Sequence, residues 1–540
     1  MALPEVNSLV TVVLPAALLY VIHLLFFRIV IPPNVPFVRE PPGKTSFSWR
    51  TRLAYLTDCE SIFREAYHNV SYRELRIASI TANQAAQYSK QGKAVVVPGF
   101  GVRNEVILPV SSLRWVLAQP ESVLSVDDAF VEVDQADYSL GHAKYIQDAW
   151  QAMLVKTELN PVLENIVAAL NDELGVAFDE YFGTDEENWR DIDLLETVRM
   201  VVAQAASRFT VGLPMCRNQQ YLNDAFDAID GCIINAGVTG GTPLILRPIV
   251  GRLVSIKTRL AQRKIQKHFR PTYRARLETL KHSPGDPNHV EPQDHLQMML
   301  RFAQKERPHE LYDETNIAWR LTAANFGSMH QTSIQVTNML LNILGSDAEY
   351  DTIAVLRDEI ARIKGSDKHW TKAMVSKMVR ADSVARETMR CHSFGGRAVF
   401  RKVMADGVET DAGVQLPKGT VFSFLSQPAH ADEATYEEPL KYDPFRFSRV
   451  REAATEANKA SNLSFVSTSA VYMVFGHGKH ACPGRFLIDF ELKMIISYVL
   501  ANYDVKFPEE YENKRPANEW MAEALAPPKG VRVLVKRRTA

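Results

Sequence analysis

A glycine-containing loop presents a single cysteine directly before an apolar helix, and this arrangement constrains the chain more than any other feature of its sequence. The loop runs from Phe475 to Gly484 with Cys482 near its end, and the apolar segment Phe486–Leu500 follows at once. A cysteine at a helix N-terminus gains from the helix dipole and from free backbone N–H groups, so we expect its thiolate to be favoured. Gly478 and Gly484 allow the backbone to turn sharply and a flat ligand to approach the sulfur. The alternative is an ordinary buried thiol, which we expect the other cysteines to be.

Composition bounds the kind of protein and its compartment. The 540 residues are enough for a large buried core, and 46% hydrophobic with 23% charged residues is typical of a globular chain. The 5 cysteines form no CxxC pair and are odd in number, which favours a reducing compartment over a disulfide framework. A formal net charge of -1 gives no overall field toward nucleic acid, and we expect no nucleic-acid partner.

One segment departs from this balance of charge. Arg252–Lys281 holds ten lysines and arginines against one acid, Glu278. Contact with nucleic acid or an anionic membrane is one interpretation. The solvated face of one long helix is the other, and the sequence favours it because no known phosphate-binding motif accompanies the charges.

The N-terminus carries the pattern of a membrane anchor. The segment Leu9–Phe27 is 19 residues long and has no acidic or basic side chain if His23 is counted as neutral, close to the ~20 residues that a helix needs to cross a bilayer. Arg28 follows and the next acid is Glu40, so the positive-inside rule places the body of the protein in the cytosol. We predict a single-pass anchor over residues 1–31, a proline-rich hinge over 32–44 and one domain over 45–540. A buried core helix is the alternative for the anchor.

Helical periodicity dominates the rest of the chain, and strands are few. Helices are predicted at Tyr145–Leu170, Leu194–Phe209, Gly251–His282, Thr315–Leu344, Tyr350–Ile363 and Trp370–Arg390. Strands are predicted as two antiparallel pairs and a last single strand: Ala94–Val97 with Val106–Leu108, Arg397–Val403 with Gly419–Phe424, and Val531–Val535. The predicted fold class is mainly α with small antiparallel β-sheets in one large domain.

The cysteine loop resembles the signature F-x-x-G-x-R-x-C-x-G of the cytochrome P-450 superfamily, matched at Phe475, Gly478, Cys482 and Gly484. The resemblance implies the cytochrome P-450 fold, haem b (iron protoporphyrin IX) as cofactor, and Cys482 as the thiolate ligand of its iron. A thiolate ligand favours O–O cleavage. The matched residues and His480 are then cofactor-binding residues. His480 stands where the family usually has arginine, so a hydrogen bond to a haem propionate is retained with a less assured charge.

Three further segments follow the order of the family. Glu387 and Arg390 match its E-x-x-R motif, whose spacing puts both side chains on one face of a helix. Residues 442–447 resemble its F-x-P-x-R-F segment and supply Arg446, and residues 430–432 resemble the H-x-D that lies upstream. The resemblance implies a structural ionic triad of Glu387, Arg390 and Arg446 that locks the core and the haem-side loop.

The oxygen-activating helix departs from the family pattern. Members usually carry an acid followed by an alcohol that relay protons, whereas this chain has His330 and Gln331 there, followed by Thr332. Gly327 lies just before them, where it can relax the helix and open a groove. Proton delivery through His330, Gln331, Thr332 or a held water is one interpretation, and ordinary polar residues of a helix interior are the other. A shift of one residue to Thr332 rotates the side chain by roughly 100°.

The resemblance implies further contacts around the haem. Lys156 and Arg401 fit the basic residues that bind the propionates, with Arg397 as the competitor of Arg401 and a solvated face as the alternative for Lys156. The walls of the substrate pocket are expected near Asp128–Gly141, Asn325–Thr332 and Ser393–Gly396. Three cations near the cysteine loop are candidate docking charges for a redox partner, with surface decoration as the alternative: Lys479, Arg485 and Lys493.

The expected function is that of a microsomal monooxygenase in the endoplasmic reticulum membrane. Electrons are expected from NADPH through the flavins of NADPH–cytochrome P-450 reductase, with cytochrome b5 as a second candidate partner. No charged pair stands out in the pocket segments, so we expect a mainly apolar small substrate. Resemblance to filamentous-fungal members implies secondary metabolism. The alternatives are oxidative coupling or desaturation on the same haem, and a haem-thiolate isomerase without oxygenase activity.

Overall fold

Helices make up most of the molecule, as the sequence predicts. The structure is a computed structural model and describes Leu18 and residues 31–68, 92–283, 286, 289–454 and 461–539. Its α-helices are α2 (Trp49–Thr57), α3 (Cys59–His68), α4 (Leu113–Ala118), α5 (Asp127–Val133), α6 (Ala136–Ser139), α7 (Lys144–Gln147), α8 (Trp150–Tyr181), α9 (Leu194–Thr210), α10 (Gln219–Gly240), α11 (Arg247–Thr279), α12 (His295–Glu306), α13 (Pro308–Leu311), α14 (Glu314–Phe326), α15 (Met329–Tyr350), α16 (Thr352–Lys364), α17 (Lys372–Ser376), α18 (Val379–Cys391), α19 (Gln427–His430), α20 (Arg446–Glu452) and α21 (Arg485–Asn502).

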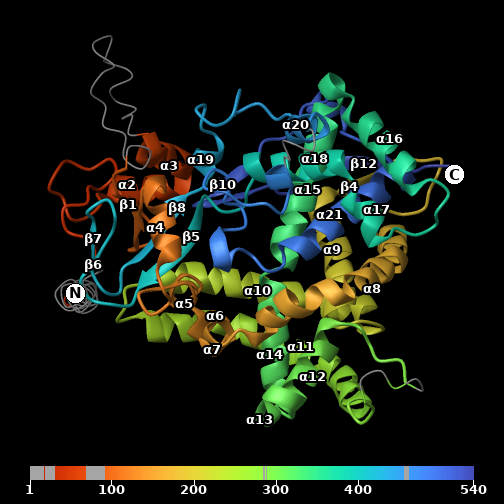
Figure 1. The fold of residues 1–540 in the computed structure, drawn as a ribbon, viewed down its shortest axis with the longest axis horizontal. Coiled ribbons are helices and arrows are strands. Elements are labelled where there is room, and N and C mark those ends of the chain that lie inside the picture. The colour runs from red at the N-terminus through yellow and green to blue at the C-terminus, as the bar shows by residue number, and fades with distance from the viewer. Residues whose placement is uncertain are drawn as a thin grey trace, which may run out of the picture.

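The strands form small sheets at opposite ends of the molecule (Figure 1). They are β1 (Val95–Pro98), β2 (Asn104–Ile107), β3 (Leu124–Ser125), β4 (Arg190–Asp193), β5 (Arg397–Val403), β6 (Val408–Glu409), β7 (Gln415–Leu416), β8 (Val421–Leu425), β9 (Tyr503–Lys506), β10 (Glu519–Met521), β11 (Ala524–Ala526) and β12 (Arg532–Arg537). The largest sheet has the order β1-β2-β8-β5-β3 and lies with α2 and α3, whereas β12 pairs with β4 and β9 at the other end.

Both predicted antiparallel pairs form, and they join into one sheet. β1 pairs with β2 and β5 pairs with β8, both antiparallel. The connection between the two pairs is parallel, through β2 and β8, which periodicity along the chain does not reveal. Part of the predicted hinge also joins this sheet, because Phe37 and Val38 are buried and the N–H of Val38 donates to the carbonyl of Val96 at 3.0 Å.

The largest apolar core lies where α8, α9, α15, α18 and α21 meet. α15 is buried without interruption from Thr332 to Ile343. A helix buried on all sides must be apolar or have its polar groups hydrogen-bonded within the protein. The buried part of α15 contains apolar side chains together with hydrogen-bonded polar ones. This helix and α18 therefore form a rigid centre on which the functional segments rest.

Several helix predictions need correction, since Tyr145–Leu170 is divided into α7 and α8 and Trp370–Arg390 into α17 and α18. The predicted helix Thr315–Leu344 is broken at residues 327–328 into α14 and α15, because Gly327 and Ser328 leave the regular helical pattern. α10 was not predicted at all, although it spans 22 residues. It carries three glycines, which weaken the helical signal, and packing against α11 offsets their intrinsic cost.

The predicted membrane span at residues 9–27 lies, apart from Leu18, outside the described residues. Within the part of the chain that the structure describes, none of the helices combines the length and apolar character needed to cross a bilayer.

The close approach of α10 and α11 yields a test of the packing. A methyl group at Gly231 would lie 2.4 Å from the hydroxyl of Thr258 and 3.3 Å from its Cα, whereas a methyl group at Gly237 would meet nothing within 4 Å. We expect Gly231→Ala to destabilise the protein by about 1–3 kcal/mol through overpacking. Gly237→Ala, on the same helix, is the matched control and should stabilise it by up to ~1 kcal/mol. Thermal unfolding midpoints check both, and an equal effect of the two variants would contradict this packing.

Candidate active site

The loop that carries Cys482 is folded tightly against itself. The N–H of Cys482 donates to the carbonyl of Phe475 at 2.8 Å, and the ring of Phe475 is buried. The sharp turns occur at Gly476 and Gly478, whose φ angles of 68° and 76° lie in the left-handed region. Gly484 does not turn the chain as predicted: it is the N-cap of α21 at φ -77°, and a methyl group there would lie 3.9 Å from the sulfur.

The protonation of the Cys482 thiol is set by two opposing effects. Burial raises its pKa above the ordinary value, whereas backbone N–H groups of Gly484 and Arg485 and the charge of Arg485 lower it. The N–H groups at the helix N-terminus therefore favour the thiolate as expected, but burial outweighs them and the net direction of the pKa is upward. A coordinated metal ion deprotonates a thiol outright, and the two N–H groups then stabilise the resulting charge.

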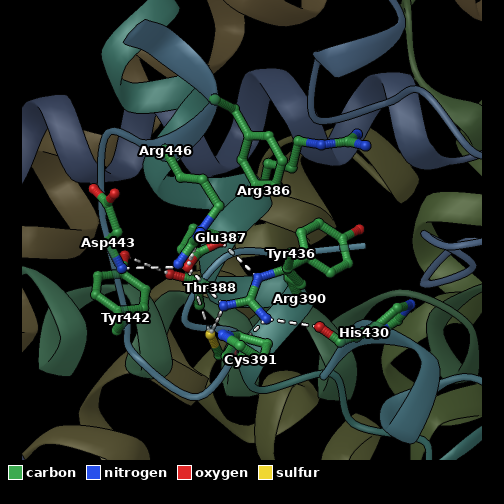
Figure 2. A network of polar contacts seen from close by, with 12 residues as sticks. Arg386, Glu387, Thr388, Arg390, Cys391, His430, Tyr436, Tyr442, Asp443 and Arg446 are labelled. Carbon is green, nitrogen blue, oxygen red and sulfur yellow. Dashed lines mark hydrogen bonds and ion pairs between the residues drawn. The ribbon is translucent and has the colours of Figure 1, made fainter. Parts of the chain in front are cut away.

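Glu387 accepts hydrogen bonds from two arginines in the interior (Figure 2). Arg390 binds both of its carboxylate oxygens at 2.8 Å, and Nε of Arg446 binds Oε1 at 3.1 Å. Glu387 is fully buried and Arg390 is 1% exposed. Burial on its own lowers the pKa of Arg390, and Glu387 reverses this and raises it, so the guanidinium stays charged. The structure thus brings the three residues of the predicted triad together.

The triad is linked to the cysteine loop by His430. Arg390 donates to the carbonyl of His430 at 2.7 Å, and the N–H of Met473 donates to Nε2 of His430 at 3.1 Å. Burial, with smaller contributions from two arginines, lowers the pKa of His430 to about 3, so its ring is neutral and Nε2 accepts. Met473 in turn accepts from the N–H of Gly476, at the start of the turn that leads to Cys482.

A second group of charges on α18 also holds the segment before the loop, and the motifs did not reveal it. Nη1 of Arg386 donates to the carbonyls of Ser464 and Ser467 at 2.6 and 3.0 Å. Asp382 accepts from the N–H of Phe465 at 2.8 Å. The available signal was spacing, since Asp382, Arg386 and Arg390 follow one another at intervals of four residues on one face of the helix.

One predicted docking charge is not at the surface. Nζ of Lys493 lies 2.9 Å from Asp382 and 2.6 Å from Asp489, and the side chain is 3% exposed. Lys493 therefore cannot meet a partner, and it neutralises buried acids instead. Arg485 is half-buried and donates to the carbonyl of Cys482 at 2.7 Å, whereas Lys479 is exposed.

Basic residues gather beside the cysteine loop, where the propionates were expected. Nε2 of His480 lies 2.8 Å from Glu121, and burial, partly opposed by Glu121, lowers the pKa of His480. The positive charges of Arg401 and Lys156 act on the same ring and lower it further. Lys156 also lines a shallow cavity of about 300 Å³ with Gly478 and other loop residues. Several cations facing one acid form a site for anionic groups.

The competition between Arg397 and Arg401 is decided by their partners. Arg397 is buried between Glu105 and Glu523, at 3.0 and 2.5 Å, and both carboxylates keep its charge compensated. Arg401 donates to the carbonyl of Phe400 at 2.8 Å, and burial lowers its pKa with partial compensation from Glu121. Arg401 is thus the arginine with spare donors for a propionate.

The break between α14 and α15 exposes the predicted proton-delivering segment. The hydroxyl of Ser328 donates to the carbonyl of Ala324 at 3.2 Å, satisfying an acceptor left by the break. Gln331 is exposed although it lies next to the buried part of α15, and Thr332 is 2% exposed. The rotation between the two positions places Gln331, and not Thr332, on the open side. His330 is half-buried, with its ring against that of Phe394 at 5.9 Å.

The basic helix α11 is only partly a solvated face. Lys264 pairs with Asp224 at 3.3 Å, Arg270 with Glu314 at 3.0 Å, and the buried Arg276 with Asp294 at 2.5 Å. These acids come from neighbouring elements, which explains why the segment is so basic when read alone. Gly396, at the end of the predicted pocket wall Ser393–Gly396, leaves room for Phe63, whose ring would lie 2.5 Å from an added methyl group.

These groups fit haem, with a sulfur supported by two N–H groups and cations placed for the propionates, and they define a haem-thiolate protein. A model of the cytochrome P450 family matches residues 149–535. The chain is 51% identical over 536 residues to cytochrome P450 monooxygenase pbrC of Penicillium brasilianum, covering 98% of this chain and 97% of the relative. It is 50% identical over 526 residues to monooxygenase astC of Aspergillus terreus, covering 96% and 94%. The chain belongs to the cytochrome P450 family and is an oxidoreductase, a cytochrome P450 monooxygenase.

Solved structures agree on the fold. A cyanobacterial protein bound to retinoic acid superposes with a TM-score of 0.62 at 15% identity, covering 94% of this chain and 100% of that one. The haem domain of cytochrome P450DA gives a TM-score of 0.63 at 15% identity, covering 95% and 99%. The predicted family and the mainly helical fold with small antiparallel sheets are confirmed.

The buried triad leads to a stability prediction. Glu387→Ala would leave Arg390 charged and unpaired in the interior, and we expect a loss of about 3–5 kcal/mol of unfolding free energy. Glu306→Ala is the control, because Glu306 pairs with Lys305 at 3.2 Å on the surface. The control should change stability by less than ~1 kcal/mol. Denaturant unfolding followed by circular dichroism measures both, and equal stability of the two variants would contradict a supporting role of Glu387.

Proposed function

We propose that this chain is a haem-thiolate monooxygenase that inserts oxygen into a mainly apolar small molecule in fungal secondary metabolism. The observation that carries the proposal is Cys482 itself, held by Phe475 at the N-terminus of α21 and supported by two backbone N–H groups. The overall reaction is balanced when substrate RH, O2, two electrons and two protons give ROH and H2O. Relatives from two fungi that are called monooxygenases support the reaction type and the fungal setting.

Each part of the site has a task in this reaction. Haem, when bound, supplies the iron centre at which O2 is activated. Cys482 would hold the iron, Arg401 and Lys156 would neutralise the propionates, and His480 would donate a hydrogen bond to one of them. The exposed Gln331 and its neighbour His330 line the side from which protons arrive. The triad takes no part in chemistry and keeps the cysteine loop in place.

Electron supply in the proposal comes from outside the chain. NADPH–cytochrome P-450 reductase delivers electrons one at a time, with cytochrome b5 as a second possible donor. Lys479 is exposed beside the cysteine loop and provides positive charge for an acidic partner surface. Oxidative coupling or desaturation is the alternative outcome on the same haem, and a haem-thiolate isomerase would need neither NADPH nor reductase.

The proposal includes a location in the endoplasmic reticulum membrane. Residues 1–31 form the anchor and residues 45–540 the cytosolic catalytic domain, and within the proline-rich connection 32–44 Phe37 and Val38 pack into the sheet of that domain. The support is the run of 19 uncharged residues, Leu9–Phe27, followed by Arg28.

The ligand assignment is tested by the absorption spectrum of the dithionite-reduced protein with carbon monoxide. We expect the strongly red-shifted Soret band of a thiolate-ligated haem in the wild type and its loss in Cys482→Ala. Cys59→Ala is the control, because Cys59 is a free buried cysteine on α3, and the band should be unchanged. A band of the histidine-ligated type in folded wild type would contradict the proposal.

The reaction is then tested by reconstitution with reductase, NADPH and isotope-labelled O2 over a panel of apolar terpenoid, alkaloid and polyketide compounds. A product that carries labelled oxygen and requires NADPH supports the monooxygenase. An NADPH-dependent product without labelled oxygen supports coupling or desaturation, and turnover without NADPH supports the isomerase.

The anchor is tested by removing residues 1–31. The full chain should stay in the microsomal pellet after alkaline carbonate washing, since a spanning helix is not released by pH, and the shortened chain should move to the supernatant. Retention of the shortened chain in the washed pellet would contradict an anchor confined to these residues.

A further inference from the structure

The stretch of α14 and α15 on either side of His330 carries no carboxylate. Residues 315–346, which include nearly all of α14 and most of α15, contain no aspartate or glutamate. The position at which the family usually has an acid holds His330. An acid that supplies protons to His330 therefore has to come from outside this stretch, on a neighbouring element.

α10 places Asp230 beside this histidine. Oδ1 of Asp230 lies 3.7 Å from Nδ1 of His330. The distance is too long for a direct hydrogen bond, yet Nδ1 is buried and has no hydrogen-bond partner among the described residues. A buried ring nitrogen without a partner is costly, and a bridging water or a small rotation of the ring toward Asp230 would satisfy it. Phe394 packs edge-on against the same ring at 5.9 Å and limits its other movements.

Asp230 is connected to the surface through α9. Nη2 of Arg199 lies 2.8 Å from Oδ2 of Asp230, and Nη1 of Arg199 lies 3.3 Å from Glu196. The side chains of His330, Asp230 and Glu196 are 22%, 33% and 64% exposed, so exposure increases along this series. Asp230 is thus accessible enough to solvent to take protons from it, and close enough to His330 to pass them inward.

The charges around His330 set how readily it takes a proton. Burial lowers its pKa, Asp230 from α10 raises it, and Arg199 from α9 lowers it slightly. Residues 393–396, which bring the ring of Phe394, contain no charged side chain. Asp230 is therefore the group that keeps His330 able to accept a proton.

We propose that Asp230 and His330 form the proton-supplying pair of this enzyme, with the carboxylate on α10 and the relay group at the start of α15. His330 releases a ring proton toward the haem side and regains one from solvent by way of Asp230, so the pair is unchanged after each transfer. Asp230 acts through His330 and is a positioning residue. The pair takes the place of the acid and alcohol that the family usually carries on one helix. The inference rests on the proposed monooxygenase function.

The test compares Asp230→Asn, Asp230→Glu and the control Asp227→Asn in the full-length holoenzyme. Asp227 lies on α10 and is exposed. The first measurement is the pKa of His330 by NMR of histidine-labelled protein, with the resonance assigned by His330→Gln. Loss of the raising charge should lower this pKa by about 1 unit in Asp230→Asn, Asp230→Glu should restore most of it, and Asp227→Asn should leave it unchanged.

The second measurement needs no added substrate. In the reductase-reconstituted holoenzyme, O2 goes either to H2O2, with two electrons and two protons, or to two H2O, with four of each. We expect Asp230→Asn to slow NADPH consumption about tenfold, to increase the share released as H2O2, and to move the alkaline limb of the pH profile to lower pH.

The outcomes separate this inference from the proposed function. If Asp230→Asn keeps the thiolate-type carbon monoxide band but matches Asp227→Asn in the pKa of His330 and in the H2O2 share, the pairing is wrong. If the wild type lacks that band or does not consume NADPH with reductase, the proposed function is wrong, whatever the pKa of His330 shows.

Discussion

The functional part of this protein depends on a carboxylate that two arginines bind in the interior. Arg390 and Arg446 both pair with Glu387, and removing the carboxylate would leave the charge of the buried Arg390 unpaired. From Arg390, hydrogen bonds run through His430 and Met473 to the turn before Cys482. Directional bonds to buried charges are strong, so the position of the sulfur is specified by the core and not by the loop alone.

The opposite requirement holds where the chemistry needs access. The break at Gly327 and Ser328 interrupts an otherwise buried helix and leaves Gln331 exposed while Thr332 stays inside. A continuous apolar helix would pack more regularly but would present no polar groups there. The structure thus combines a rigid support under Cys482 with a local irregularity of the helix beside His330 and Gln331, and local irregularity of this kind is typical of functional sites.

Residues that lie in short motifs could be predicted from the sequence, whereas residues that only folding brings together could not. Short motifs visible in the sequence were sufficient to predict the importance of Cys482, Glu387, Arg390 and Arg446. Asp230 has no motif around it, and it gains its meaning from lying 3.7 Å from His330 on another helix. The sequence suggests that Lys493 is a surface cation, because no neighbouring residue shows that Asp382, more than a hundred residues away, neutralises it. The same reason explains why α11 looks so basic, since its acids lie on other elements.

By itself the sequence determined the family, the mainly helical class and the residues of the triad, because each depends on residue types within short motifs. Only the tertiary structure decided that Arg397 is bound by two acids while Arg401 has donors to spare, and that burial outweighs the helix N-terminus at the thiol. Burial and charge pairing depend on which distant segments meet, and a linear pattern does not contain that information. Electrostatic energies change severalfold between water and the interior, so the same side chain has a different role in each place.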